Sequence, residues 1–465
     1  MSTVDARLAA VRPSPRQQAW QEMEYIAFAH FGINTFTDRE WGEGTEEPAL
    51  FSPTALDAGQ WVDACRRAGM RMIILTAKHH DGFCLWPSAH TEHSVRQSPW
   101  RQGRGDVVRE VADACRAGGL RFGVYCSPWD RHEPSYGNSP AYNQFFRRQL
   151  TELLTGYGEI AEVWFDGACA EGPNGRRQEY DWESYYRLVR QLQPQAVIAI
   201  CGPDVRWVGN ESGLARDDEW SVLPAAAAAD DDVATHFQHV DSQAGDLADG
   251  ARLAAAERLI WYPAECDVSI RPGWFYHAAE DLRVKSLPHL EDIYYRSVGR
   301  NSVLLLNVPP DRRGLFHEYD VARLAELRRS LARTFAENLA RVGTLQADSQ
   351  ADAGHGAAAA LDRRADTWWS AAPDCRQAVL ELDLGAAPPA FDRLELREPI
   401  ALGQRITRFR LEGWDHGCWR LICEGASVGY RRLERLGRIQ VPRVRLVIDQ
   451  ARESPALATF GLYLS

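Results

Sequence analysis

Short apolar runs alternate with longer segments of helical periodicity through most of the chain. The apolar runs lie at residues 25–34, 71–82, 121–130, 160–167, 196–204, 259–267 and 303–310. Segments with apolar residues at i, i+3 and i+4 separate the earlier runs, at residues 57–70, 106–120, 139–158 and 180–194. Strands that alternate with helices predict a parallel sheet, and roughly eight such units favour a closed (β/α)8 (TIM) barrel. A doubly wound open sheet is the alternative, although no G-x-G-x-x-G follows the first run.

The pattern changes after a helical segment at residues 317–339. A polar, alanine-rich stretch at residues 346–360 predicts a boundary, and the runs beyond it alternate apolar and polar residues. That alternation is typical of an antiparallel β-sandwich. We therefore predict an α/β barrel domain over residues 1–342 and a C-terminal β-sandwich domain over residues 343–465. A second low-complexity piece, residues 224–232, is expected to form an exposed loop of the barrel.

The charge balance restricts the possible partners. The chain holds 53 Lys and Arg against 64 Asp and Glu, a net charge of −11, and it has no basic run. Because nucleic-acid binding needs clustered cations, no nucleic-acid partner is expected. No membrane partner is expected either, since no 18-residue apolar run occurs. The N-terminus lacks an apolar signal core, which predicts a cytoplasmic protein, or a periplasmic or secreted one if a leader has been removed.

Polar residues gather at one end of the apolar runs. His30, His79, His80, Asp166 and Asn307 all lie at or just past the C-terminal end of a run. A barrel places its active site at this end of its strands, so we expect these side chains to meet there. Asp166 is the candidate catalytic carboxylate, because it directly follows a strand and could face a sugar ring as a nucleophile. The competing interpretation is a turn or helix-capping aspartate.

A glycosidase needs a second carboxyl group, and the chain offers three candidates. Glu211 lies in a Gly-flanked, Trp-containing loop, which suits a general acid/base that closes over a substrate. Glu265 ends a strand and could instead line the pocket, and Glu219 is the third candidate. The local patterns alone do not separate Glu211 from Glu265.

The sequence gives little support to a bound metal. The ten cysteines lie singly between Cys65 and Cys423 without a C-x-x-C pair, which predicts reduced thiols. Adjacent histidines in a strand are expected to point to opposite faces, and His79 and His80 do not form an H-x-H pattern. Together with His30 they leave a metal-dependent barrel hydrolase as an alternative. Hydrogen bonding to sugar hydroxyls suits neutral imidazoles better.

Aromatic and acidic residues near the strand ends supply candidate pocket walls. Glu40 and Trp41 place a hydroxyl acceptor beside an apolar ring, and Tyr125 and Trp129 follow a later run. Trp274 offers a further wall. Aromatic faces suit sugar rings, although core packing is the competing interpretation of each residue taken alone.

Five motifs in order now resemble those of glycoside hydrolase family 29, the α-L-fucosidases: HFGINTFTDREWGEG, LTAKHHDGFCLWPS, GVYCSPWD, VWFDGA and WVGNESG. The resemblance runs from residue 15 to residue 340. It is greatest to the branch that cleaves α-1,3- and α-1,4-linked fucose from branched glycans. The C-terminal part resembles a discoidin-like carbohydrate-binding module through residues 361–371 and 411–425, and we expect it only to buttress the barrel.

The resemblance implies a retaining mechanism without metal or cofactor, acting on a fucosylated oligosaccharide or glycoconjugate. Asp166 matches the family's nucleophile and Glu211 the acid/base of the 1,3/1,4 branch. The matching pocket residues are His30, Glu40, Trp41, His79, His80, Tyr125 and Trp164, to which we add Glu265 and Trp274. A broad-specificity α-L-fucosidase with Glu265 as acid/base is the alternative. With Glu211 catalytic, the sequon at Asn210 is expected to be a chance match.

Overall fold

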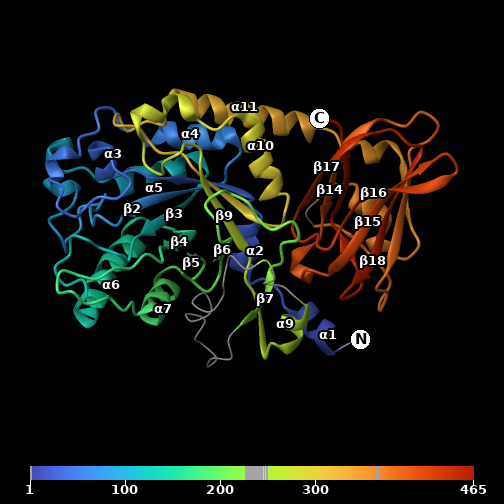
Figure 1. The fold of residues 1–465 in the computed structure, drawn as a ribbon, viewed down its shortest axis with the longest axis horizontal. Helices are drawn as coiled ribbons and strands as arrows, with labels where there is room; N and C mark the ends of the chain where they lie inside the picture. The colour runs from blue at the N-terminus through green and yellow to red at the C-terminus, as the bar shows by residue number, and fades with distance from the viewer. Residues whose placement is uncertain (1–2, 226–244, 246, 248–249, 363, 365) are drawn as a thin grey trace.

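The computed structural model describes residues 3–225, 245, 247, 250–362, 364 and 366–465, which form a barrel and a β-sandwich side by side (Figure 1). Eight parallel strands make the barrel sheet in the order β5-β4-β3-β2-β1-β10-β9-β6. They are β1 (Tyr25–Ala29), β2 (Met72–Lys78), β3 (Arg121–Cys126), β4 (Glu162–Phe165), β5 (Val197–Ile200), β6 (Arg206–Trp207), β9 (Ala264–Ser269) and β10 (Val303–Asn307). A single parallel bridge between Ala199 and Val205 joins the two ends of the sheet. The predicted barrel class is confirmed.

Amphipathic helices cover the outside of the barrel, as the periodicity predicts. In α4 (Ala58–Ala68) the buried face holds Trp61, Val62 and Cys65. The Asp57 carboxylate caps its first turn, and Gly69 ends it at a positive φ of 87° that glycine adopts without strain. The other helices are α1 (Thr3–Ala10), α2 (Pro15–Gln21), α3 (Ile33–Thr37), α5 (Val107–Gly118), α6 (Ser139–Gly156), α7 (Trp182–Leu192), α9 (Gly250–Ala255), α10 (Leu287–Arg296) and α11 (Glu318–Thr334).

The regular alternation of strand and helix stops after β5. Strand β6 follows β5 after a five-residue turn, and the hairpin of β7 (Val222–Ala225) and β8 (Arg258–Trp261) comes before β9. The alternation of strand and helix is therefore incomplete in this half of the eight-stranded barrel. The expected exposed loop at residues 224–232 begins inside β7, and its remaining residues lie outside the described part of the chain.

Antiparallel sheets form the C-terminal sandwich, as predicted. The larger sheet has the order β11-β13-β18-β15-β16, and β17-β14-β20 and β12-β19 complete the domain. Its strands are β11 (Thr344–Ala347), β12 (Trp369–Ser370), β13 (Ala378–Asp383), β14 (Phe391–Arg397), β15 (Ile406–Asp415), β16 (Cys418–Gly425), β17 (Arg432–Ile439), β18 (Arg443–Ala451), β19 (Ala456–Leu457) and β20 (Thr459–Tyr463).

The polar stretch at residues 346–360 packs into the sandwich. Its first two residues lie in β11, and its buried residues Ala357 and Ala360 belong to the sandwich core. The passage between domains comes earlier, between α11 and β11, where α11 runs along the upper edge of the molecule (Figure 1).

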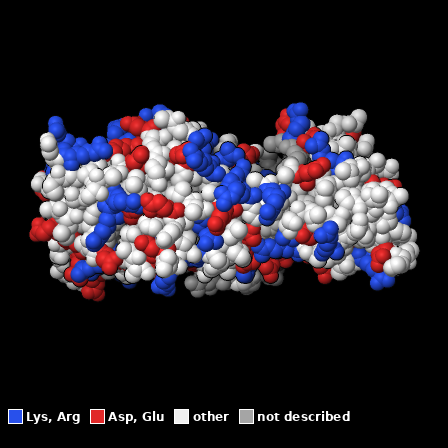
Figure 2. All heavy atoms as spheres, turned by 90° about the horizontal axis from the view of Figure 1, so that it is seen from above, with Lys and Arg blue, Asp and Glu red and all other residues white. Residues whose placement is uncertain are grey.

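Ion pairs connect the barrel to the sandwich. Glu24 of the barrel forms ion pairs with Arg397 at 2.7 Å and with Arg431 at 2.6 Å, and Glu395 forms ion pairs with both of the same arginines. On the surface, acidic residues lie among the basic ones (Figure 2). Within the described residues, no helix has the length and apolar content needed to cross a membrane.

Candidate active site

Strand β4 points every second side chain into the barrel. Glu162 and Trp164 lie on this inner face, and Asp166 continues the same register just past the strand end. The Tyr125 hydroxyl, from neighbouring β3, donates to Asp166 Oδ2 at 3.0 Å, and the Ala168 backbone N–H donates to Oδ1 at 2.8 Å. The Asp166 side chain remains 27% exposed. A hydrogen-bonded carboxylate therefore stands at the barrel mouth with one side open.

The competing interpretation of Asp166 as a helix cap does not hold. The next helix, α7, is capped by the Asp181 carboxylate, which accepts from the Ser184 N–H at 3.3 Å. Asp166 does form a local turn bond to the Ala168 N–H, but its other oxygen is bonded by the Tyr125 hydroxyl.

His30, His79 and His80 meet beside Asp166 from β1 and β2. The rings of His79 and His80 lie 4.1 Å apart, so the expectation that they point to opposite faces was wrong. Strand β2 ends at Lys78, and the alternation of side chains ends with it. Burial lowers the pKa of His30 to about 3, and it also lowers the pKa values of His79 and His80. These imidazoles are therefore neutral at neutral pH.

Hydrogen bonds show which ring nitrogen carries the proton in His30 and in His80. The Asn307 amide donates to Ser269 Oγ and to the Trp274 carbonyl, so its oxygen accepts from His30 Nδ1 at 2.9 Å. Ser127 Oγ donates to the Trp129 carbonyl and so accepts from His80 Nδ1 at 2.7 Å. Nε2 of each ring is then a free acceptor for a hydroxyl, and that of His80 lies 3.8 Å from Asp166 Oδ2.

Asp166 and Glu211 line one cavity of about 300 Å³. Its other lining residues are Trp164, Gly167, Ala168, Ile200, Cys201, Arg206, Trp207, Tyr262 and Asp267. Glu211 Oε2 accepts from Trp274 Nε1 at 3.3 Å, which ties the Glu211 loop to the loop after β9. The Asn210 amide donates to the Leu214 carbonyl at 2.8 Å, so the side chain of the sequon holds this loop in its turn.

Glu40 and Trp41 have different environments. Glu40 accepts from the Trp274 N–H at 2.8 Å, the Phe275 N–H at 3.1 Å and His277 Nε2 at 2.7 Å. It therefore holds the loop that carries Trp274, which leaves its oxygens less free for a sugar than the sequence suggested. The Trp41 ring is 59% exposed and meets His80 edge-on, with 5.7 Å between ring centroids, so it forms an open wall.

The other two acidic candidates do not line the cavity. Glu219 is buried in ion pairs with Arg206 and Arg216. Glu265 is the second residue of β9 rather than its end, has no exposed surface, and accepts from Trp164 Nε1 at 2.8 Å. It thus supports the wall of the cavity from the barrel interior.

Sequence reasoning missed Asp267. It lines the cavity, and its Oδ1 accepts from Trp207 Nε1 at 2.7 Å. Burial raises its pKa well above the usual aspartate range, and the neighbouring charges of Glu265 and Glu211 add to this. The signal was available, because Asp267 lies two residues after Glu265 on one strand and so shares its inward face.

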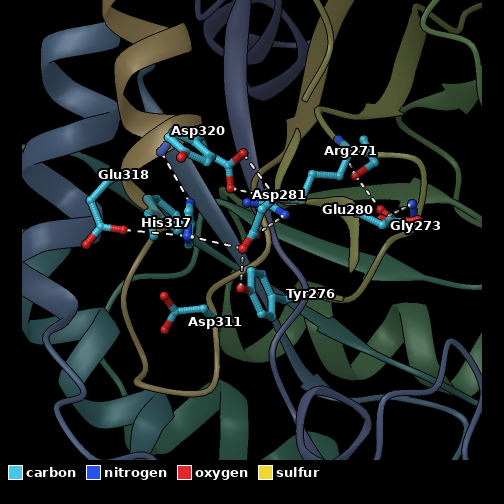
Figure 3. Close-up of polar contacts among 12 residues, drawn as sticks. Arg271, Gly273, Tyr276, Glu280, Asp281, Asp311, His317, Glu318 and Asp320 are labelled. Atoms are coloured by element: carbon cyan, nitrogen blue, oxygen red, sulfur yellow. Dashed lines mark hydrogen bonds and ion pairs between the residues drawn. The ribbon is translucent and has the colours of Figure 1, made fainter. Parts of the chain in front are cut away.

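A buried ion-pair network anchors the loop that carries Trp274 (Figure 3). The Arg271 guanidinium has no exposed surface and donates to Asp320 of α11 at 2.8 Å and to Asp281 at 2.9 Å. The Tyr276 ring packs on it with 4.8 Å to the centroid. The loop is therefore held by Glu40 on one side and by α11 on the other.

Among the described residues, no group of three or more His, Cys, Asp or Glu side chains is arranged to hold a metal ion. All ten cysteines are free thiols, as predicted. The cavity instead combines the carboxylates of Asp166 and Glu211 with indole rings, and neutral imidazoles lie beside Asp166. This combination suits acid/base and nucleophilic chemistry on a sugar.

Comparison with known proteins gives the family. A family model for α-L-fucosidases matches residues 13–334. The chain is 44% identical to Alpha-L-fucosidase 1 of Arabidopsis thaliana over 459 residues, 97% of this chain and 87% of that protein. It matches a fucose complex of a Ruminococcus gnavus family 29 fucosidase at 30% identity with a TM-score of 0.85, over 98% of this chain and 95% of that one. It also matches a crystal structure from Bacteroides ovatus with a TM-score of 0.87 at 47% identity, over 100% of this chain and 76% of that one. The chain therefore belongs to glycoside hydrolase family 29 and is an α-L-fucosidase.

Proposed function

We propose that the enzyme removes α-1,3- or α-1,4-linked fucose from branched glycans with retention of configuration, using Asp166 as nucleophile and Glu211 as general acid/base. The observation that carries this proposal is that the two carboxylates line one cavity of about 300 Å³. A retaining glycosidase needs one carboxylate at the anomeric carbon and a second at the glycosidic oxygen.

In the first step, an Asp166 oxygen attacks the anomeric carbon of fucose, and the bond to the leaving sugar breaks. Glu211 gives its proton to the departing oxygen, so an ester between fucose and Asp166 remains. Glu211, now ionised, takes a proton from water as the water attacks the same carbon. The ester bond breaks, and fucose leaves with its α configuration retained.

The surroundings of Asp166 support its role. Bonds from the Tyr125 hydroxyl and the Ala168 N–H fix the orientation of the carboxylate, and 27% of its side chain stays open to the cavity. The nearby His80 Nε2 is an acceptor, which suits a sugar hydroxyl beside the reacting carbon.

Access supports Glu211 over Glu265 as acid/base. Glu211 is exposed on a loop and reaches the cavity, whereas Glu265 is fully buried and bonded to the Trp164 indole. An acid/base must reach both the leaving oxygen and a water molecule, and a carboxyl beneath a tryptophan reaches neither. The preference for branched substrates rests on the resemblance of residues 207–213 to the 1,3/1,4 branch.

The first test compares fucose release from a branched Lewis-type trisaccharide and from an aryl α-L-fucoside by the parent and Asp166→Ala. We expect strong release from the trisaccharide, weak release from the aryl compound, and neither from the variant. Efficient aryl hydrolysis would instead assign broad specificity. Loss of the parent activity with a chelator would point to a metal-dependent hydrolase.

Rescue by azide tests the two roles separately. In Asp166→Ala, azide is expected to attack the anomeric carbon from the vacated face and give the β-fucosyl azide. In Glu211→Ala, azide replaces water at the fucosyl ester and gives the α-fucosyl azide. Glu211→Ala should also slow the cleavage of substrates with a sugar leaving group more than the cleavage of aryl fucosides, because an aryl oxygen departs without a proton. The same product from both variants would exclude this assignment.

A further inference from the structure

Two carboxyl groups lie inside the barrel beneath the active site and have no part in the proposed chemistry. Glu162 begins β4 and Glu265 is near the start of β9, and neither has any exposed surface. Each accepts one indole N–H at 2.8 Å: Glu162 Oε2 from Trp20, and Glu265 Oε1 from Trp164.

The second oxygens of the two carboxyls are buried without a donor. Glu162 Oε1 and Glu265 Oε2 have no hydrogen-bond donor among the described residues, and each carboxyl is a hydrogen-bonding neighbour of the other. Two ionised carboxylates only accept hydrogen bonds, so a bond between them requires a proton on one of them. Two like charges in contact in a buried site cannot both be ionised at modest cost. A hydrogen bond between these two buried carboxyls therefore needs one proton between them.

The surroundings keep that proton in place. The side chains packed in this part of the barrel are mainly apolar, among them Ile26, Phe28, Met72, Ile74 and Leu305. Burial raises the pKa of Glu162 to about 8 and that of Glu265 well above the usual range.

Two further acidic side chains lie near the pair. The charge of Asp204 raises the pKa of Glu162 further, although Asp204 is itself paired with Arg16 at 3.1 Å and with Arg190. Burial raises the pKa of Asp267, a neighbour of Glu265, well above the usual aspartate range, so its carboxyl favours the neutral form. Asp204 thus favours the protonated pair.

Trp164 connects this pair to the active site. It lies between Glu162 and Asp166 on the inner face of β4, and its ring lines the cavity. The same ring packs on Tyr125 with 5.2 Å between centroids, and the Tyr125 hydroxyl donates to Asp166. The indole is anchored at its far edge by the bond to Glu265.

We propose that Glu162 and Glu265 are positioning residues that share one proton and thereby hold the Trp164 indole as a wall of the sugar-binding cavity. The role of the wall rests on the proposed function, whereas the shared proton does not. Loss of the proton at alkaline pH places two charges in an apolar space. The carboxyls then separate, the indole loses its anchor, and KM rises while kcat changes little.

Two substitutions of Glu162 separate the effect of the shared proton from the effect of side-chain shape. Glu162→Gln supplies a permanent N–H donor to Glu265, so the bond no longer depends on a proton. We expect its KM to rise less than the KM of the parent at alkaline pH. Glu162→Leu removes the bond altogether and should raise KM about tenfold at pH 7, since a buried acceptor loses its partner. Glu159→Gln, at an exposed carboxyl before the same strand, is the matched control.

Infrared spectroscopy detects the proton without any substrate. The parent at pH 7 should show a protonated-carboxyl stretch that Glu162→Gln and Glu265→Gln both lose and that Glu159→Gln keeps.

Thermal unfolding gives a second readout. The raised pKa of Glu162 means that the folded state binds this proton more tightly than the unfolded state does. The free energy of unfolding of the parent should therefore fall between pH 4.5 and pH 8, and Glu162→Gln should lack this contribution.

The outcomes are distinct. An unchanged carboxyl band in both Gln variants, or an alkaline rise of KM in Glu162→Gln equal to that of the parent, overturns the shared proton. Failure of the proposed function gives a different result: the parent then releases no fucose although the carboxyl band is present.

Discussion

The Tyr125 hydroxyl donates to Asp166 Oδ2 at 3.0 Å across two neighbouring strands of the barrel. This bond directs the carboxylate that we propose as the nucleophile. Its donor is buried, since Tyr125 is only 1% exposed, so water does not replace the bond easily when it is removed.

Tyr125→Phe is therefore expected to lower kcat by about tenfold or more, because a hydrogen bond to a charged group contributes about 1.5–3 kcal/mol. Steady-state kinetics on a fucosylated substrate measures the effect. The control is Tyr157→Phe, which removes a bond of the same 3.0 Å length to Asp106, and neither residue lines the cavity. Equal effects of the two substitutions would show that the Tyr125 bond acts only on stability.

His277 makes the Trp274 loop sensitive to pH. Burial lowers its pKa, but hydrogen bonds to Asp38 and Glu40 outweigh this and raise the pKa above its usual value. The charged form thus holds the loop at low pH, and the bonds weaken as the pH rises through the raised pKa. We expect this loss to contribute to an increase of KM on that alkaline side, so the increase should be smaller in His277→Asn than in the parent. A KM profile of His277→Asn that follows the parent would contradict this.

The Arg271 network should dominate the stability of the same loop. Arg271→Met leaves Asp320 buried without its cation, and breaking such a pair costs about 3–5 kcal/mol. Chemical denaturation measures the free energy of unfolding. Arg283→Met is the control, because Arg283 lies in the same segment but is 66% exposed and pairs with Glu280 only at 3.9 Å. Similar losses from both substitutions would argue against a special role of the network.

Asp267 is expected to act as a neutral group in the cavity. Burial raises its pKa well above the usual range, so Asp267→Asn preserves both the charge state and the acceptor for the Trp207 indole. Its kcat/KM should stay within about threefold of the parent, whereas Asp267→Leu should lose about tenfold or more by leaving the indole N–H unpaired. Steady-state kinetics of the two variants at pH 7 tests this. A large loss of kcat/KM in Asp267→Asn would show that the enzyme needs an ionised aspartate at this position.

Local patterns predicted the strand ends well but misplaced three side chains. Asp166 and Asn307 stand where their apolar runs end, because strand length is legible in the sequence. Glu40 was read as a free acceptor, yet it is bonded by backbone N–H groups of a loop more than 230 residues away. Glu265 was read as a strand end, and Asp267 was missed, because the register of β9 in the barrel is set by its neighbours β10 and β6.

The sequence by itself determined the barrel, the following sandwich and the family, because hydrophobic periodicity and ordered motifs are local properties of the chain. It also placed the histidines and Asp166 at one end of the strands. Tertiary structure alone decided which carboxyls share a cavity, which are buried, and which bonds hold the Trp274 loop. Those properties depend on distance and burial between residues far apart in the chain, such as Glu162 and Glu265, and no local pattern encodes them.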